Sequence, residues 1–181
     1  MSKTCNFIIR PAQPSDIPAL DALIVLSAQE LSQGFMPEEE IKASIDHIYG
    51  VDTELVSDGT YFVAEKDGKP VACGGWSKRK TLFGGDRYAG REAGFLDPAI
   101  DAAKIRAFFV HPDYARQGIA HAMLEKCEAE MKDAGFMQSE MMATLPGIPF
   151  YERNGYRRLE EHVHQLPNGS TARGVRMSKA I

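Results

Sequence analysis

The residues best suited to chemistry in this chain lie in the turn at residues 114–120, which reads YARQGIA. The turn combines a cation at Arg116, a glycine at Gly118 and a small side chain at Ala120. If a helix begins here, its first backbone N–H groups lack partners and lie at the positive end of the helix dipole. Such a turn can bind a phosphate or pyrophosphate. The alternative is a tight turn that only caps an amphipathic helix.

Residue types exclude two familiar phosphate-binding loops at this position. A Walker loop requires Gly-Lys followed by Ser or Thr, and a dinucleotide-binding turn requires three spaced glycines; residues 114–120 contain neither pattern.

The segments on either side of the turn predict a strand followed by a helix. Apart from Arg106, residues 105–110 are apolar, β-branched or aromatic, and Pro112 ends the strand because proline cannot donate a ladder hydrogen bond. Beyond Gly118 the apolar residues recur at every fourth position, which is the helical period, and Gly135 ends the helix. These apolar residues are Ile119, Met123, Cys127 and Met131.

The rest of the chain predicts one mixed α/β domain over residues 1–181. We expect a strand at 6–10, helices after Ser15 and Pro37, and a hairpin of strands 60–65 and 71–77 around an Asp-Gly turn. A strand at 136–143, a short helix within 149–156 and two terminal strands, 157–165 and 171–179, complete the order. The pair Gly74-Gly75 predicts a bulge or a close approach within its strand.

Residues 79–103 show no period and predict a loop on the substrate side. Asp97 and Asp101 within it would favour a small cationic amine, although Asp97-Pro98 is also a common turn signal. His162 and His164 lie two apart on one strand, which would suit a metal pair, but no third ligand is evident and we expect no metal.

Composition limits the class of protein. At 181 residues with 44% hydrophobic and 25% charged residues, the chain has the composition of a soluble globular protein. No segment approaches a membrane span, and the three separated cysteines suit a reducing compartment, so we expect a cytoplasmic protein without membrane contact. The net charge of −4 gives no general attraction to nucleic acid.

Two motifs together resemble the GCN5-related N-acetyltransferase (GNAT) family. Val110-His111-Pro112 and Gly118-Ile119-Ala120 match its acyl-CoA loop, although Ala115 stands at the first loop position and the Arg and Gln follow it. About thirty residues later, the segment PFYERNGY at 149–156 is similar to a later motif of the same family. Residues 9–20 and 175–179 also resemble the family's first and last segments, so that only residues 79–103 lack a counterpart.

The resemblance implies a fold and a cofactor. The implied fold is a mixed, mostly antiparallel sheet of about seven strands with a splayed central parallel pair, flanked by about four helices. Acetyl-CoA would lie in that opening as the acyl donor. The backbone of Phe108, Phe109 and Val110 would pair with the pantetheine, and Phe150 would lie beside the cysteamine end. The pyrophosphate would be held by the amides of the loop, namely Arg116, Gln117, Gly118, Ile119 and Ala120.

The resemblance also implies direct attack of an amine on the thioester in a ternary complex. The backbone N–H of Phe109 or Val110 would stabilise the oxyanion, and Tyr151 would protonate the leaving thiolate. Some members carry a Glu that acts as the general base near the start of the central strand, but Lys104 occupies that position here. Glu140 on the following strand is therefore the candidate general base.

The acceptor would be the amine of a small molecule or of a protein, and the family often forms homodimers. The alternative is a non-catalytic acyl-CoA sensor of the same fold, which is favoured by the absence of the family's Glu and of the Asn that often precedes the second motif.

Overall fold

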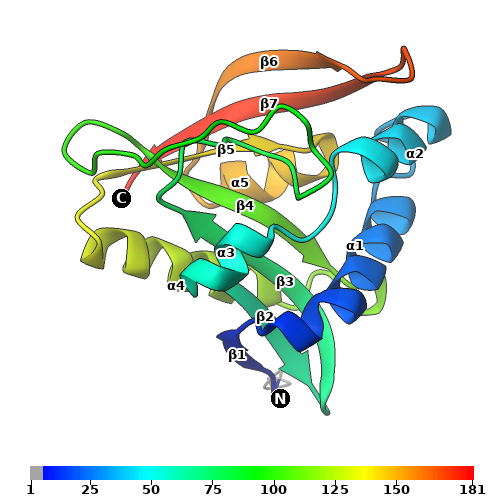
Figure 1. Cartoon of the computed structure of the whole chain (residues 1–181). Coiled ribbons are helices and arrows are strands. Elements are labelled where there is room, and N and C mark those ends of the chain that lie inside the picture. Colours follow the sequence, from blue (N-terminus) through cyan, green and yellow to red (C-terminus); the bar gives the residue numbers. More distant parts are fainter. Residues whose placement is uncertain (1–5) are drawn as a thin grey trace.

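The computed structural model describes residues 6–181, which are built on a seven-stranded sheet in the order β1-β2-β3-β4-β5-β7-β6 (Figure 1). The strands are β1 (Ile8–Pro11), β2 (Tyr61–Lys66), β3 (Lys69–Ser77), β4 (Ala103–Val110), β5 (Gln138–Ala143), β6 (Arg157–Gln165) and β7 (Thr171–Ala180). The helices are α1 (Ile17–Leu31), α2 (Glu38–His47), α3 (Thr53–Asp58), α4 (Ile119–Asp133) and α5 (Ile148–Arg153). The predicted mixed, mostly antiparallel sheet is confirmed.

The pair β4 and β5 is the parallel pair of this sheet, and it is joined at one end only. Ala103 pairs with Ser139 and Lys104 with Glu140, after which the two strands separate. The remaining neighbours pair antiparallel over four or more residues. The predicted splayed pair is therefore present, and it leaves an opening in the middle of the sheet.

A bulge in β4 shapes the edge of that opening. Between the pairs Cys73–Phe109 and Gly75–Arg106, β4 has one more residue than β3, and Ala107 takes a left-handed φ of 51°. The Phe108 ring lies over Gly74, where an added Cβ would be 2.5 Å from a ring carbon. The predicted bulge at Gly74-Gly75 is thus present in the partner strand, and the missing side chain leaves room for Phe108.

Alternate residues of β2 face two hydrophobic cores, one on each side of the sheet. Phe62 and Ala64 belong to the core that contains Met123 and Cys127 of α4. Tyr61 and Val63 face the other way, toward a core with Leu20, Ile24 and Leu55 from α1 and α3. The two helical layers fix the sheet between them, and both contribute walls to the opening.

The helix α3 was not predicted, and its signals are local. The Asp52 side chain accepts the N–H of Glu54 at 3.0 Å and caps the helix, and Gly59 ends it with a φ of 74°. A helix of six residues has too few turns for the helical period to be recognised in the sequence. The other predicted helices and strands are present with ends that differ by a few residues; β1, for example, includes Pro11, which is tolerated because β1 is an edge strand.

Residues 78–102 contain one isolated bridge, between Arg79 and Phe95, and no helix or strand. Within the described residues, no helix combines the length and hydropathy needed to cross a bilayer.

Candidate active site

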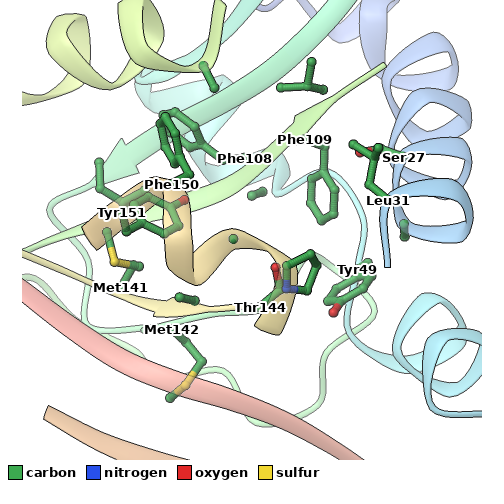
Figure 2. A pocket seen from close by; sticks show the side chains of 18 of the residues that line it. Ser27, Leu31, Tyr49, Phe108, Phe109, Met141, Met142, Thr144, Phe150 and Tyr151 are labelled. Atoms are coloured by element: carbon green, nitrogen blue, oxygen red, sulfur yellow. The ribbon is translucent and has the colours of Figure 1, made fainter. Parts of the chain in front are cut away.

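A cavity of about 760 Å³ occupies the opening between β4 and β5 (Figure 2). Its volume is in the range of small-molecule and cofactor sites. Two arms can be distinguished by their walls. The loop arm is lined by Val110, Arg116, Gly118, Ile119 and Ala120. The aromatic arm, toward α1 and β7, is lined by Leu31, Tyr49, Phe83, Met142, His164 and Arg173.

The loop arm is built on the sharp turn before α4. Gly118 is the residue before the helix, with a φ of 83°, and Arg116 also takes a left-handed φ of 63°. Such a conformation is uncommon for a residue with a side chain and marks a constrained turn. The Arg116 side chain is exposed, and within residues 6–181 no hydrogen bond or ion pair is formed by it. A cation and the first N–H groups of a fifteen-residue helix therefore lie at the same end of the cavity.

The structure brings most of the predicted donor-binding residues to this cavity. Residues in its wall are Phe108, Phe109, Val110, Arg116, Gly118, Ile119, Ala120, Phe150 and Tyr151. Gln117 is not in the wall, and its side chain donates to the carbonyl of Asp113 at 3.0 Å. A further hydrogen bond stabilises the start of the loop: the N–H of Asp113 donates to the His111 ring at 3.2 Å.

The ladder between β3 and β4 determines which N–H of β4 faces the opening. The N–H of His111 donates to Val71 on β3 at 2.8 Å. Since successive N–H groups of a strand point to opposite edges, Val110 directs its N–H away from β3 and toward the gap with β5. By the same alternation, the N–H of Phe109 points toward β3. Of the two predicted oxyanion donors, the geometry favours Val110.

Tyr151 lies in the cavity wall and packs in an aromatic cluster. It is 7% exposed, and its ring is 5.0 Å from Phe150 and 5.7 Å from Tyr156 in edge-to-face contacts. Burial raises the pKa of the Tyr151 phenol well above its ordinary value of 10.0. Its hydroxyl makes no hydrogen bond with any residue of the described range. The cavity thus contains a protonated phenol that is not committed to the protein.

Glu140 lies outside the cavity wall, in contrast to its predicted role. One carboxylate oxygen contacts Nζ of Lys104, and the other is 2.7 Å from Arg176. The side chain is 7% exposed. A carboxylate neutralised by two cations and closed off from the ligand is a poor general base, and this placement argues against that role.

The residues of the aromatic arm had no motif in the sequence. They come from six separate segments, and only the fold brings them together. The Phe109 ring meets Tyr49 at 5.4 Å, and Phe83 packs on His164 at 4.3 Å. In Figure 2, Tyr49, Leu31 and Phe109 gather on the α1 side of the cavity, away from Phe150 and Tyr151.

His164 belongs to this arm and does not form a metal site. Its Nε2 atom is buried without a hydrogen-bond partner, and burial lowers its pKa below the ordinary 6.5, with a smaller effect from His162. The two imidazole rings are stacked at 5.6 Å. Within residues 6–181, no group of three His, Cys, Asp or Glu side chains is placed to hold a metal ion.

The loop at residues 78–102 contributes Leu82, Phe83 and the following two glycines to the cavity wall. Arg106 of β4 holds this loop, because its guanidinium donates to the carbonyls of Thr81 and Gly84. Nη2 of the same residue is 2.7 Å from Asp52 at the start of α3, in a buried ion pair. Arg106 therefore joins α3, the loop and the central strand.

Asp97 and Asp101 do not reach the cavity. Asp101 accepts the N–H of Asp97 at 2.7 Å, and Asp97 accepts the N–H of Ala99 at 3.0 Å, so both carboxylates stabilise their own turn. Neither residue lines the cavity, which argues against the expected contact with a cationic substrate there.

Comparison with known families agrees with this geometry. Residues 57–158, more than half of the chain, match the family described as Acetyltransferase (GNAT) domain. The chain belongs to the GNAT acetyltransferase family. The matched range contains the loop arm, Tyr151 and the bulged strand β4.

Solved structures of GNAT proteins share the fold over nearly the whole chain. A GCN5-related N-acetyltransferase from Rhodopseudomonas palustris is 20% identical with a TM-score of 0.71, covering 96% of this chain and 95% of its own. The PaiA N-acetyltransferase of Thermoplasma acidophilum, solved with coenzyme A, is 16% identical with a TM-score of 0.64, covering 97% and 99%. The Escherichia coli ribosomal-protein-S18-alanine N-acetyltransferase is 18% identical with a TM-score of 0.58, covering 97% and 94%. Among functionally curated proteins, none has a significantly similar sequence.

Proposed function

We propose that this protein is an N-acetyltransferase that moves the acetyl group of acetyl-CoA to a primary amine by direct attack in a ternary complex. The observation that carries the proposal is the continuous cavity that runs from the glycine turn before α4, through the gap between β4 and β5, to the aromatic arm. Residues 1–181 would act as one N-acetyltransferase domain. Family membership supports acyl transfer, and the cavity supports two substrates bound end to end.

The loop arm would hold the donor. The N–H groups at the start of α4 and the guanidinium of Arg116 suit the pyrophosphate of CoA. The pantetheine amides would complete the open edge of β4 at Phe108 and Val110, in the manner of an added strand. Phe150 would pack beside the cysteamine.

The chemistry then requires three events at the thioester. A neutral amine attacks the carbonyl carbon, and the N–H of Val110 stabilises the oxyanion. The C–S bond breaks, and the Tyr151 hydroxyl donates its proton to the thiolate, which leaves as the CoA thiol. The amine nitrogen loses its extra proton to water, since Glu140 does not reach the cavity, and water returns a proton to the Tyr151 phenolate.

An acyl-enzyme route through cysteine is not supported. Cys73 and Cys127 are buried with no exposed surface, and neither is in the cavity wall. Burial raises the pKa of the Cys73 thiol to about 12 and that of Cys127 further still, so neither provides a thiolate near neutral pH. Cys5 lies outside the described residues. Direct transfer needs no such nucleophile.

The second candidate is a sensor that binds acyl-CoA without turnover. It is favoured by one observation: among the described residues, no Asp or Glu lies in the cavity wall to accept the proton of the amine.

Thiol release from acetyl-CoA, measured with a panel of amines together with the mass of the acetylated product, separates the two candidates. Amine-dependent thiol release with an acetylated product supports the enzyme. Binding of acetyl-CoA by calorimetry without release with any amine supports the sensor.

A further inference from the structure

The aromatic arm has a chemical character that bears on the acceptor amine. Aromatic and aliphatic side chains form most of its wall, notably Leu31, Tyr49, Phe83 and Met142. The side chains of the cavity wall that carry a formal charge near neutral pH are all cationic. They are Arg106, Arg116, Arg153 and Arg173. In the part of the chain that the structure describes, the cavity wall contains no carboxylate.

Two carboxylates next to the wall arginines Arg106 and Arg173 are already neutralised. Glu40 accepts the backbone N–H of Arg173 at 2.8 Å and an Nη2 hydrogen bond from the same residue at 2.8 Å. Asp52 has no exposed surface and is bonded to Arg106 and Arg91. A second ammonium group bound in the arm would find no carboxylate in the wall to pair with, because Asp52 and Glu40 are already paired with arginines.

Apart from Arg173, which is paired with Glu40, the titratable groups of the arm are neutral near neutral pH. Burial lowers the pKa of His164, as described above, and raises that of the Tyr49 phenol to about 12. An amine that enters such surroundings loses hydration, which disfavours its charged form and lowers its pKa. The arm thus favours the neutral amine that the attack requires, without a carboxylate base. Aromatic rings attract one ammonium group during entry.

We infer that the acceptor is a primary monoamine with an apolar or aromatic body, and not a polyamine. This inference rests on the proposed function, since it assigns the aromatic arm to the acceptor. It replaces the expectation of a cationic substrate, because Asp97 and Asp101 do not face the cavity.

A pair of nearly isosteric amines tests the inference. Pentylamine and putrescine have chains of equal length, and they differ in a terminal methyl group where putrescine has its second ammonium. With acetyl-CoA and the wild-type protein, kcat/KM is expected to be roughly tenfold or more higher for pentylamine than for putrescine. The kcat/KM for phenethylamine should be at least as high as that for pentylamine. Equal values, or a preference for putrescine, would overturn the inference.

Leu31 offers a matched pair of variants. It is a half-buried residue at the end of α1 in the wall of the arm. Leu31→Glu introduces the missing carboxylate, whereas Leu31→Gln has the same size without the charge. The ratio of kcat/KM for putrescine to kcat/KM for pentylamine should rise in Leu31→Glu and not in Leu31→Gln. An unchanged ratio in Leu31→Glu would contradict the assignment of this arm to the acceptor.

Binding of the same amines separates this inference from the proposed function. Calorimetry with protein saturated with CoA measures acceptor binding without any chemistry. If no amine is acetylated, the proposed function fails, but stronger binding of pentylamine than of putrescine would still support the assigned acceptor class. If neither amine binds, or putrescine binds more tightly, the inference is overturned even where acetylation occurs.

Discussion

Tyr151 combines two properties that a general acid needs: its hydroxyl is uncommitted, and its pKa is raised by burial, so that it stays protonated throughout an ordinary assay range. We predict that Tyr151→Phe lowers kcat about 10²-fold or more while the Kd for acetyl-CoA changes little, because only the proton donor is lost and the ring packing remains. Steady-state thiol release and calorimetry measure the two quantities. A loss of cofactor affinity with unchanged kcat would assign Tyr151 to packing beside the cofactor instead.

His164 gives a prediction for pH. The pKa of His164 in the folded protein lies below its ordinary value of 6.5. Between the folded-state pKa and 6.5, the unfolded chain therefore binds more protons than the folded one. Stability should therefore fall as the pH drops below about 6.5. His164→Phe retains a ring against Phe83 and should show a smaller decrease in Tm from about pH 7.5 to about pH 5. Equal decreases in wild type and variant would show that His164 does not carry this dependence.

The loop at residues 78–102 depends on Arg106, which donates to two of its carbonyls and pairs with Asp52. Arg106→Met leaves the buried Asp52 carboxylate with Arg91 as its remaining cationic partner, so the free energy of unfolding should fall by about 3 kcal/mol, measured by urea denaturation. Hydrogen exchange in residues 79–95 should increase, because the carbonyls of Thr81 and Gly84 lose their donor.

The double variant Arg106→Met/Asp52→Asn is the control for that charge. Asn still caps α3 and no longer leaves a buried anion, so part of the lost stability should return. Equal destabilisation in the single and double variants would mean that the ion pair does not hold the loop.

The bulge of β4 depends on the absence of a side chain at Gly74. In Gly74→Ala the new Cβ would lie 2.5 Å from Phe108, so the ring must move. We predict a loss of roughly 1–3 kcal/mol in stability and weaker acetyl-CoA binding, because Phe108 lines the cavity.

Gly68→Ala provides the comparison in the same hairpin. Gly68 has a φ of 73° and no atom within 4 Å of an added Cβ, so the change strains the turn without touching Phe108. Acetyl-CoA affinity should be unchanged in Gly68→Ala. An equal loss of acetyl-CoA affinity in both variants would show that the bulge does not determine donor binding.

Most of the element order could be predicted from the sequence because its signals are local: strand and helix periods, the Asp-Gly turn, and the prolines and glycines at the ends. The positive φ of Ala107 has no such signal, since alanine rarely adopts it. Ion pairs around the site join residues that are distant in sequence: Arg106 and Asp52 are 54 residues apart, and Lys104 and Glu140 are 36 apart. No spacing rule predicts that Glu140 is neutralised or that Tyr49 meets Phe109.

The sheet as a whole has two open edges, β1 and β6. β6 is mostly exposed, with Leu159 54% and Val163 60% exposed, and it belongs to the terminal pair of strands, which is one place to look for the homodimer that the family often forms. The homodimer stays a prediction. Sedimentation equilibrium is expected to give twice the mass of 20.0 kDa; a mass of one chain at all concentrations would contradict it.

The central claim is that acetyl-CoA binds with its pyrophosphate at the turn before α4. Isothermal titration of acetyl-CoA against wild type, Gly118→Glu and Gly169→Glu tests it most directly. Both glycines have a φ of 83° with no atom within 4 Å of an added Cβ, so backbone strain and local space are matched, but Gly169 lies in the turn between β6 and β7. We predict binding to wild type and Gly169→Glu, and affinity lowered by roughly a hundredfold or more in Gly118→Glu, where bulk and negative charge meet the phosphates. No binding to the wild type, or equal affinity in all three proteins, would contradict the claim.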